Sequence, residues 1–190
     1  MRKEVIESIR DNYSFYTKLL EERKSVFKQV IEITEVGNNA NTLEQTTDVE
    51  HTHLANTILF IVNVKVSNYK FFQFKLRCKD LCAQPFFRYD NDGDTHRNHD
   101  ERIPLSEQQV TTPHFHYYNE KGINIAYKTP HLQNEAERQA LEDINLCIKH
   151  FCHEANIRLN HEEFPEIRIL PQALPFSLTK DDPTTNINFL

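Results

Sequence analysis

The chain has 190 residues with 38% hydrophobic and 11% aromatic side chains, which is enough apolar material for one domain with a packed core. Its formal net charge of -6 argues against a broad nucleic-acid-binding surface, because such affinity comes largely from neutralised phosphates. The N-terminus is charged, and no run of about eighteen apolar residues occurs. We therefore expect neither a signal peptide nor a membrane span, and a cytoplasmic protein.

Apolar residues recur every three or four positions near the N-terminus, from Ile6 to Val30. This spacing is typical of an amphipathic helix, and it predicts one long helix over residues 1–33 that is interrupted only at Arg23. The apolar stripe can pack on the chain's own sheet, or on a partner helix in a homodimer. A polar linker over residues 37–55 is predicted to follow.

Residues 56–128 are predicted to form an antiparallel sheet of about five strands, because short apolar and aromatic runs alternate there with turn residues. The predicted strands are residues 58–66, 69–76, 84–89, 112–118 and 123–128. The first two and the last two are close enough in the chain to form hairpins.

The turn of the second hairpin predicts its register. Gly122 suits the left-handed position of a three-residue loop, so that Asn119 pairs with Ile123. Side chains alternate along a strand, and this register separates two sets of residues. One face carries Phe115, Tyr117, Ile123, Ile125 and Tyr127, and the other carries His114, His116, Tyr118, Asn124, Ala126 and Lys128. We interpret the first face as core and the second as a functional surface.

A helix over residues 133–156 is predicted to cover the sheet, with Asn134 and Glu137 as its capping pair. The proline-rich residues 161–190 are expected to form an extended tail with little regular structure, which docks on the domain or binds a partner. The sequence thus predicts a single α+β domain over residues 1–160, followed by this tail.

The four cysteines, Cys78, Cys82, Cys147 and Cys152, have neither zinc-knuckle spacing nor the density of a secreted disulfide scaffold. We interpret them as reduced, partly buried thiols. The chain contains only three glycines, so a glycine-rich phosphate loop is not expected.

Arg, Asp, His and Tyr gather in one segment, residues 86–128, which makes it the candidate site. Residues 65–102 carry eight basic and six acidic side chains, a local charge of +2 that suits an anionic substrate. Ordinary variation of surface charge is the alternative interpretation.

One interpretation of this segment is a site for a divalent metal ion, the one cofactor that the sequence indicates. His114 and His116 are two apart on a strand and so project from one face, a familiar ligand geometry. The candidate ligands are His114, His116, His96 and Asp90, with His99 as a further histidine nearby.

A calcium loop is a weaker interpretation. Asp90, Asp92 and Asp94 occupy its first, third and fifth positions, but Thr95 occupies the sixth, where the sharp turn favours glycine. We therefore prefer a solvated turn at this point.

A third interpretation is metal-independent action on a phosphodiester. Arg88 would clamp the phosphate, His114 and His116 would act as general acid and base, Asp90 would orient one imidazole, and Tyr118 would donate a hydrogen bond. The plain alternative is a simple ion pair between Arg88 and Asp90 beside surface histidines.

The order Arg88-Tyr89-Asp90-Asn91, then His96-x-Asn98, then Pro113-His114-x-His116 resembles a group of small bacterial and prophage proteins over residues 86–128. Some of that group are toxins of toxin-antitoxin pairs that are thought to act on RNA. The resemblance implies that Arg88, Asp90, His96, His114 and His116 belong to one site. It also implies RNA as a substrate and an antitoxin-like protein as a partner.

Two functions follow from the sequence. The first is a toxin-like phosphodiesterase or ribonuclease, metal-independent or metal-assisted, with the residues just named at its site. The second is a non-catalytic module that binds a protein partner through the N-terminal helix and the tail, with histidines that stabilise the fold directly or through a metal ion.

Overall fold

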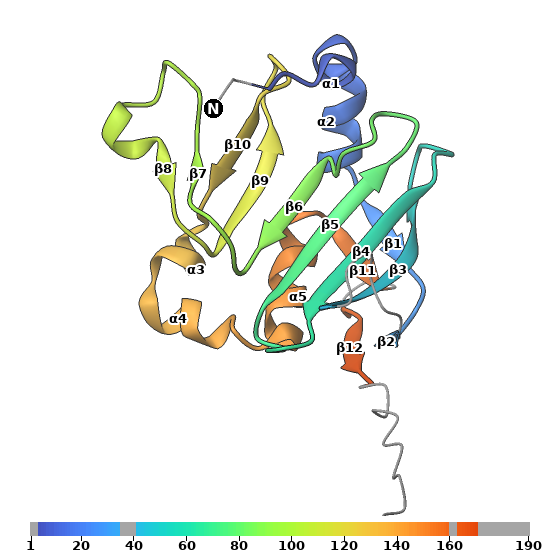
Figure 1. Cartoon of the computed structure of the whole chain (residues 1–190). Coiled ribbons are helices and arrows are strands. Elements are labelled where there is room, and N and C mark those ends of the chain that lie inside the picture. The colour runs from blue at the N-terminus through green and yellow to red at the C-terminus, as the bar shows by residue number, and fades with distance from the viewer. Residues whose placement is uncertain (1–3, 35–40, 160–162, 171–190) are drawn as a thin grey trace, which may run out of the picture.

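An eight-stranded mixed sheet organises the chain in the computed structural model, which describes residues 4–34, 41–159 and 163–170 (Figure 1). The strands lie in the order β10-β9-β6-β5-β4-β3-β1-β11, and all neighbours are antiparallel except β1 and β11. The strands are β1 (Lys24–Val26), β3 (Thr42–His51), β4 (Ile58–Lys65), β5 (Phe72–Cys78), β6 (Phe87–Asp90), β9 (His114–Tyr118), β10 (Asn124–Tyr127) and β11 (Ile157–Leu159). The predicted α+β class is confirmed, but the sheet is larger than the predicted one of about five strands and is not purely antiparallel.

The long N-terminal helix predicted over residues 1–33 is wrong. The described part of this segment forms α1 (Glu7–Asp11) and α2 (Tyr13–Glu21), and then strands β1 and β2 (Val30–Ile33). The fully buried Lys24 ammonium donates hydrogen bonds to three carbonyl oxygens at the end of α2, which satisfies groups that a helix end leaves free. Residues beyond this point alternate between more and less buried positions, which is the period of a strand.

The structure also gives no support to the alternative of a homodimer formed through the N-terminal helix. The apolar residues Ile9, Tyr16 and Leu19 are buried in the chain's own core, and at most 1% of their surface is exposed. Most of the stripe therefore packs within the chain, whereas Phe27 is 64% exposed.

The polar linker predicted over residues 37–55 is also corrected, because residues 42–51 form β3. Leu43, Thr47 and Val49 are buried while most of the intervening side chains are more exposed, so a polar composition hid a half-buried strand. Residues 35–40 lie outside the described part of the chain.

The predicted register of the second hairpin is correct. Asn124 pairs with Tyr118, and Asn119 N–H donates to the carbonyl oxygen of Ile123 at 3.1 Å. Gly122 has φ +68°, the left-handed conformation that its position in the loop requires. The two sets of side chains therefore lie on the two faces that the sequence predicts.

The single helix predicted over residues 133–156 is two helices, α4 (Glu135–Ala140) and α5 (Ile144–Glu154), and a short helix α3 (Pro130–Gln133) precedes them. Asn134 caps α4 and accepts from the Glu137 N–H, as predicted, but Asp143 starts a new helix by accepting from two N–H groups of α5.

Two short sheets lie outside the large one. Strand β12 (Glu166–Ile169) pairs with β2 in parallel, so the region predicted as an irregular tail contains a strand. Strands β7 (His96–Arg97) and β8 (Gln109–Val110), with the 3₁₀ helix Leu105–Glu107 before β8, form the other. Residues 171–190 of the predicted tail lie outside the described part.

Helix α5 covers one face of the sheet (Figure 1). Phe151 of α5 lies 5.4 Å from Phe60, 5.3 Å from Phe74 and 5.5 Å from Phe87, measured between ring centroids. Each such fully buried side chain stabilises the fold by about 1.5–3 kcal/mol. All four cysteines are buried free thiols. Within the described residues, no helix has the length and apolarity needed to cross a membrane.

Candidate metal centre

The candidate site lies on the face of the sheet opposite α5, where β6 and β9 are neighbours. Their register places Arg88 opposite His116 and Asp90 opposite His114. Because alternate residues of a strand share a face, all four side chains project to the same side. The hairpin and the short strand β6 thus assemble residues that are up to 28 positions apart in the chain.

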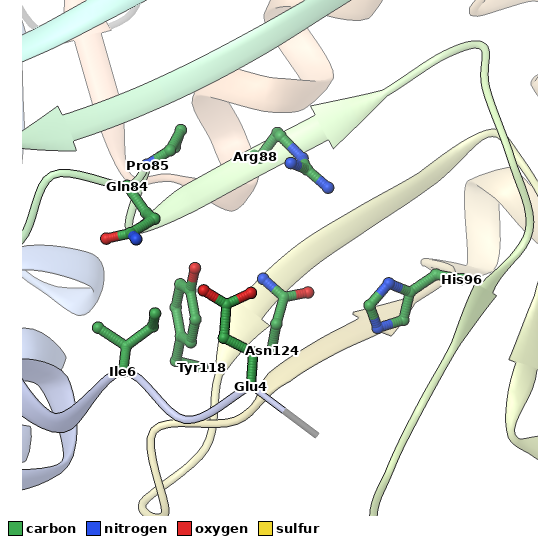
Figure 2. A pocket seen from close by; sticks show the side chains of 8 residues that line it. All are labelled: Glu4, Ile6, Gln84, Pro85, Arg88, His96, Tyr118 and Asn124. Carbon is green, nitrogen blue, oxygen red and sulfur yellow. The ribbon is translucent and has the colours of Figure 1, made fainter. Parts of the chain in front are cut away.

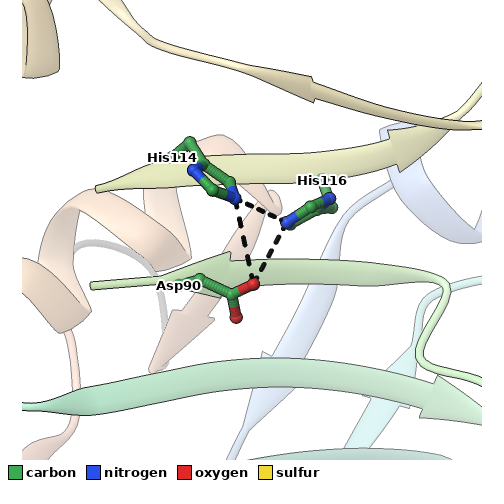
Figure 3. Close-up of side chains that lie close together, drawn as sticks. All are labelled: Asp90, His114 and His116. Carbon is green, nitrogen blue, oxygen red and sulfur yellow. Dashed lines mark hydrogen bonds and ion pairs between the residues drawn. The ribbon is translucent and has the colours of Figure 1, made fainter. Parts of the chain in front are cut away.

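Three of these side chains bring single ligand atoms together (Figure 3). Nε2 of His114 lies 2.8 Å from Nε2 of His116, which in turn lies 3.1 Å from Oδ2 of Asp90. The third side, from His114 Nε2 to Asp90 Oδ2, is 4.0 Å. Ligand atoms bound about 2.0–2.1 Å from one ion lie roughly 3.0–3.4 Å from each other. The two spacings at His116 are close to this range, and a shared metal ion needs the His114–Asp90 side to shorten by roughly 0.6 Å. We call Asp90, His114 and His116 the trio.

Burial and charge prepare the trio to act as ligands. His114 and His116 are only 1% and 2% exposed. Burial lowers the pKa of His114 to about 4, so its imidazole is neutral near pH 7. Burial alone would raise the pKa of Asp90, but the positive charge of Arg88 beside it favours the carboxylate, and that pKa lies below its ordinary value. The carboxylate is therefore ionised.

Asn124 of β10 fixes the orientation of one ligand. Its Oδ1 lies 2.6 Å from Nδ1 of His116, and an amide oxygen can only accept. The proton of neutral His116 then resides on Nδ1, and the lone pair of Nε2 points to the trio. Metal-binding histidines commonly hold their second nitrogen in this way. Sequence analysis placed Asn124 on the correct face but gave it no role.

The electron-rich atoms around His116 Nε2 need a positive charge between them. With its lone pair, this atom faces the acceptor Oδ2 of Asp90 at 3.1 Å. An imidazolium form would remove that conflict but would bring a positive charge against Arg88, whose Nη2 is 2.9 Å away. Arg88 therefore supplies the cation, and its Nε also forms an ion pair with Asp90 Oδ2 at 2.9 Å. The other carboxylate oxygen of Asp90 is buried and has no hydrogen-bond partner among the described residues.

His96 lies beside the trio but is not one of its three candidate ligands. Its ring centroid lies 4.8 Å from that of His116 and 6.3 Å from that of His114. Burial, followed by the charge of His116, lowers the pKa of His96 to about 4. Strand β7 therefore carries His96 to the face of the histidine pair, a placement that the long loop before β9 concealed at the sequence level. His99 is not part of the trio.

The calcium-loop interpretation gains no support from the geometry. Asp90 belongs to the trio, whereas Asp92 forms an ion pair with Lys65 of β4.

Two hollows meet at the site. The first hollow, about 270 Å³, adjoins the trio and is lined also by Gln73, Asp92 and Asp94. The second hollow, about 260 Å³, is shown in Figure 2. It is lined by Glu4, Ile6, Gln84, Pro85, Arg88, His96, Tyr118 and Asn124. Arg88 and His96 line both hollows, so a ligand in the second hollow lies next to the trio. Tyr118, a predicted site residue, faces the second hollow.

A family model matches residues 14–157 and is described as a family of unknown function, DUF6978. The chain belongs to the DUF6978 family. The match spans most of the chain and includes the trio, Arg88, His96 and Asn124, whereas Glu4 and Ile6 of the second hollow precede it. Comparisons with curated proteins and with solved structures gave no match. Membership of the DUF6978 family agrees with the expectation of an uncharacterised family and assigns no reaction to the site.

Proposed function

We propose that the trio binds one divalent transition-metal ion and that the protein hydrolyses phosphate esters at this ion. One observation carries the proposal: three ligand atoms converge within 4.0 Å, with one histidine held in the ligating tautomer by Asn124. Two nitrogens and one carboxylate oxygen favour ions such as Zn²⁺, Fe²⁺ or Co²⁺ over Mg²⁺ or Ca²⁺. The trio leaves coordination positions for water and substrate.

The geometry favours a metal-assisted mechanism over the metal-free pair. A general acid and a general base for phosphodiester cleavage each need hydrogen-bond reach to a different substrate oxygen. His114 and His116 instead contact each other at 2.8 Å and are almost fully buried. No substrate atom fits between the two nitrogens, so ligand roles replace acid-base roles in the proposal.

The reaction is an ordinary hydrolysis. A bound metal ion would supply a water of lowered pKa and would polarise the phosphoryl group. A bond forms between the water oxygen and phosphorus, the ester P–O bond breaks, and the water proton leaves with the alcohol. Arg88 stabilises the charge on the phosphoryl oxygens, and Asn124 keeps His116 oriented.

The first experiment measures metal binding and turnover together. Metal-free protein is titrated with Co²⁺ and followed by its visible absorption, and hydrolysis of bis(p-nitrophenyl) phosphate is assayed with the loaded protein. We expect one equivalent to bind, with turnover, and both to be lost in the double variant His114→Gln, His116→Gln. The control is His153→Gln, an exposed histidine of α5.

The outcomes separate the two functions. Absence of Co²⁺ binding would contradict the proposal as a whole. Binding that stabilises the protein without any hydrolysis would contradict the enzymatic part and would favour the alternative of a non-catalytic module with metal-stabilised histidines.

RNA is the macromolecular phosphodiester to test, because residues 86–128 resemble RNA-directed toxins. Total RNA is followed after expression of the wild type and of the double variant in a bacterial host. Fragmentation with the wild type alone would support a ribonuclease and make an antitoxin-like protein the next partner to seek. Intact RNA in both would restrict the proposal to small phosphate esters.

A further inference from the structure

Arg88 occupies the place of a cation between two atoms of the trio. Its Nη2 lies 2.9 Å from Nε2 of His116, and its Nε lies 2.9 Å from Oδ2 of Asp90. Both of these atoms are metal-ligand candidates. The guanidinium therefore neutralises the same lone pairs that a bound metal ion would.

A metal ion and the guanidinium cannot both keep these positions, because two cations this close in a partly buried site repel each other strongly. The hold on Arg88 is also incomplete. Among the described residues its buried Nε makes no hydrogen bond, although it lies 2.9 Å from the carboxylate oxygen, and 34% of the side chain is exposed. Rotation about side-chain bonds can therefore release Arg88 without disturbing β6.

We propose that a divalent metal ion displaces Arg88 from the trio, and that the displaced guanidinium forms a phosphate-binding site in the second hollow, beside the metal. The inference rests on the proposed function and adds a regulation to it. Metal-free protein keeps Arg88 in place as an internal cation, and phosphate binds well only after the metal has entered.

The lining of the two hollows favours the second as the phosphate site. Asp92 and Asp94 line the first hollow and repel an anion. The second hollow offers hydrogen-bond donors from Gln84, Tyr118 and Asn124 besides Arg88, against one carboxylate, Glu4 (Figure 2). Its volume of about 260 Å³ holds a phosphate group together with part of an ester substituent.

The first test needs no variant. Inorganic phosphate is titrated calorimetrically into metal-free and Co²⁺-loaded wild type. We expect roughly tenfold tighter phosphate binding to the loaded protein, and, because linkage is reciprocal, Co²⁺ should bind tighter by the same factor when phosphate is present. Equal phosphate affinity in both forms would overturn the inference. A protein that binds no Co²⁺ at all would remove the proposed function itself.

The second test uses Arg88→Met, which keeps an unbranched stem and removes the charge. We expect this variant to bind Co²⁺ roughly tenfold tighter than the wild type, because a competing cation is gone, and to lose metal-dependent phosphate binding. Arg138→Ala removes an exposed cation of α4 and should change neither property. Thermal melting checks that each variant is folded. Weaker or unchanged Co²⁺ binding in Arg88→Met would mean that Arg88 does not compete with the metal and would overturn the inference.

Discussion

The two faces of the sheet differ most at β6 and β9, where neighbouring residues meet opposite environments. Phe87, Tyr89 and Phe115 are at most 2% exposed and contact one another and α5 through stacked or tilted rings. On the other face, Asp90 and His116 are nearly as buried, yet they gather polar atoms whose pairing depends on a cation. The α5 face stabilises the sheet, whereas the opposite face holds the candidate site, whose buried polar groups are poorly paired within the described residues.

This contrast explains why the site belongs on these strands. A rigid apolar layer on one face fixes the backbone of β6 and β9, and the backbone in turn fixes the trio. Poorly paired buried polar groups lower the stability of a fold, and proteins commonly keep such groups at functional sites. The comparison predicts different responses of the two faces to substitution, to metal and to pH.

The largest effect is expected on the α5 face. Phe151→Ala removes a ring that contacts four other aromatic rings of the sheet, and it should lower the free energy of unfolding by about 3–5 kcal/mol. Urea denaturation measures the change. Phe27→Ala, at a side chain that is 64% exposed, should change stability by less than about 0.5 kcal/mol. Similar losses at the two positions would show that the face covered by α5 is not the main source of stability.

Metal should stabilise the opposite face. Zn²⁺ at a concentration 100 times its dissociation constant is expected to raise the free energy of unfolding by about 2.7 kcal/mol, because it binds the folded state. The double variant His114→Gln, His116→Gln should show no such gain, whereas Phe151→Ala, if still folded, should retain it. A Zn²⁺ effect of equal size in the double variant would place the ion elsewhere.

The register of the central hairpin and the shared face of His114, His116 and Asn124 were predictable from sequence because their signals are local. Gly122 determined the turn, the turn determined the register, and alternation then placed His114 and His116 on one face with Asn124. No local sequence pattern predicted that β6 pairs with β9. The clustering of chemistry-bearing residues and the resemblance both indicated that Arg88 and Asp90 lie with the histidines, but the geometry of their contacts required the structure.

The N-terminal third was mispredicted for a physical reason. Residues up to Glu21 do form helices, and the apolar spacing beyond them fits both a helical and a strand period over a short window. The choice between helix and strand depends on pairing with segments far away in the chain, because β1 lies between β3 and β11. The β3 strand is itself hard to recognise, because most of its residues are polar. Tertiary pairing of this kind leaves little trace in a single sequence.

A smaller effect concerns a histidine near the α5 side of the sheet. His150 of α5 is buried against Thr129, whose hydroxyl lies 3.0 Å from Nε2, and burial lowers the pKa of His150 to about 4. The unfolded chain binds this proton near pH 6.5, so the stability from neutral His150 is complete above that pH and is lost as the pH falls towards 4. The loss should be roughly 2 kcal/mol.

Unfolding measured by urea between pH 7 and 4.5 tests this contribution. His150→Gln should reduce the pH dependence without abolishing it, because burial also lowers the pKa values of His96 and His114, and His153→Gln, at an exposed position of the same helix, should leave it as in the wild type. An identical slope in the His150 variant would show that the buried imidazole does not control acid sensitivity.

The smallest effect expected is at Gly122, which joins the hairpin to the wall of the second hollow. The Ile6 N–H donates to the Gly122 carbonyl oxygen at 2.8 Å, and a Cβ at residue 122 would lie 2.4 Å from the Ile6 carbonyl oxygen. Gly122→Ala therefore meets both an unfavourable φ of +68° and a backbone contact, at a cost of about 1–2 kcal/mol.

Two variants separate strain from contact. Asn tolerates the left-handed conformation but still carries a Cβ, so Gly122→Asn should also release Ile6 and speed hydrogen exchange of its amide. Gly93→Ala changes a glycine with φ +129° and open space around its Cβ position, so it adds strain without moving Ile6. If the Ile6 amide exchanged at the wild-type rate in Gly122→Asn, the left-handed backbone conformation alone would explain why residue 122 is glycine. Continued fast exchange would show that Gly122 is needed because the N-terminal segment, and with it the wall of the second hollow, rests against it.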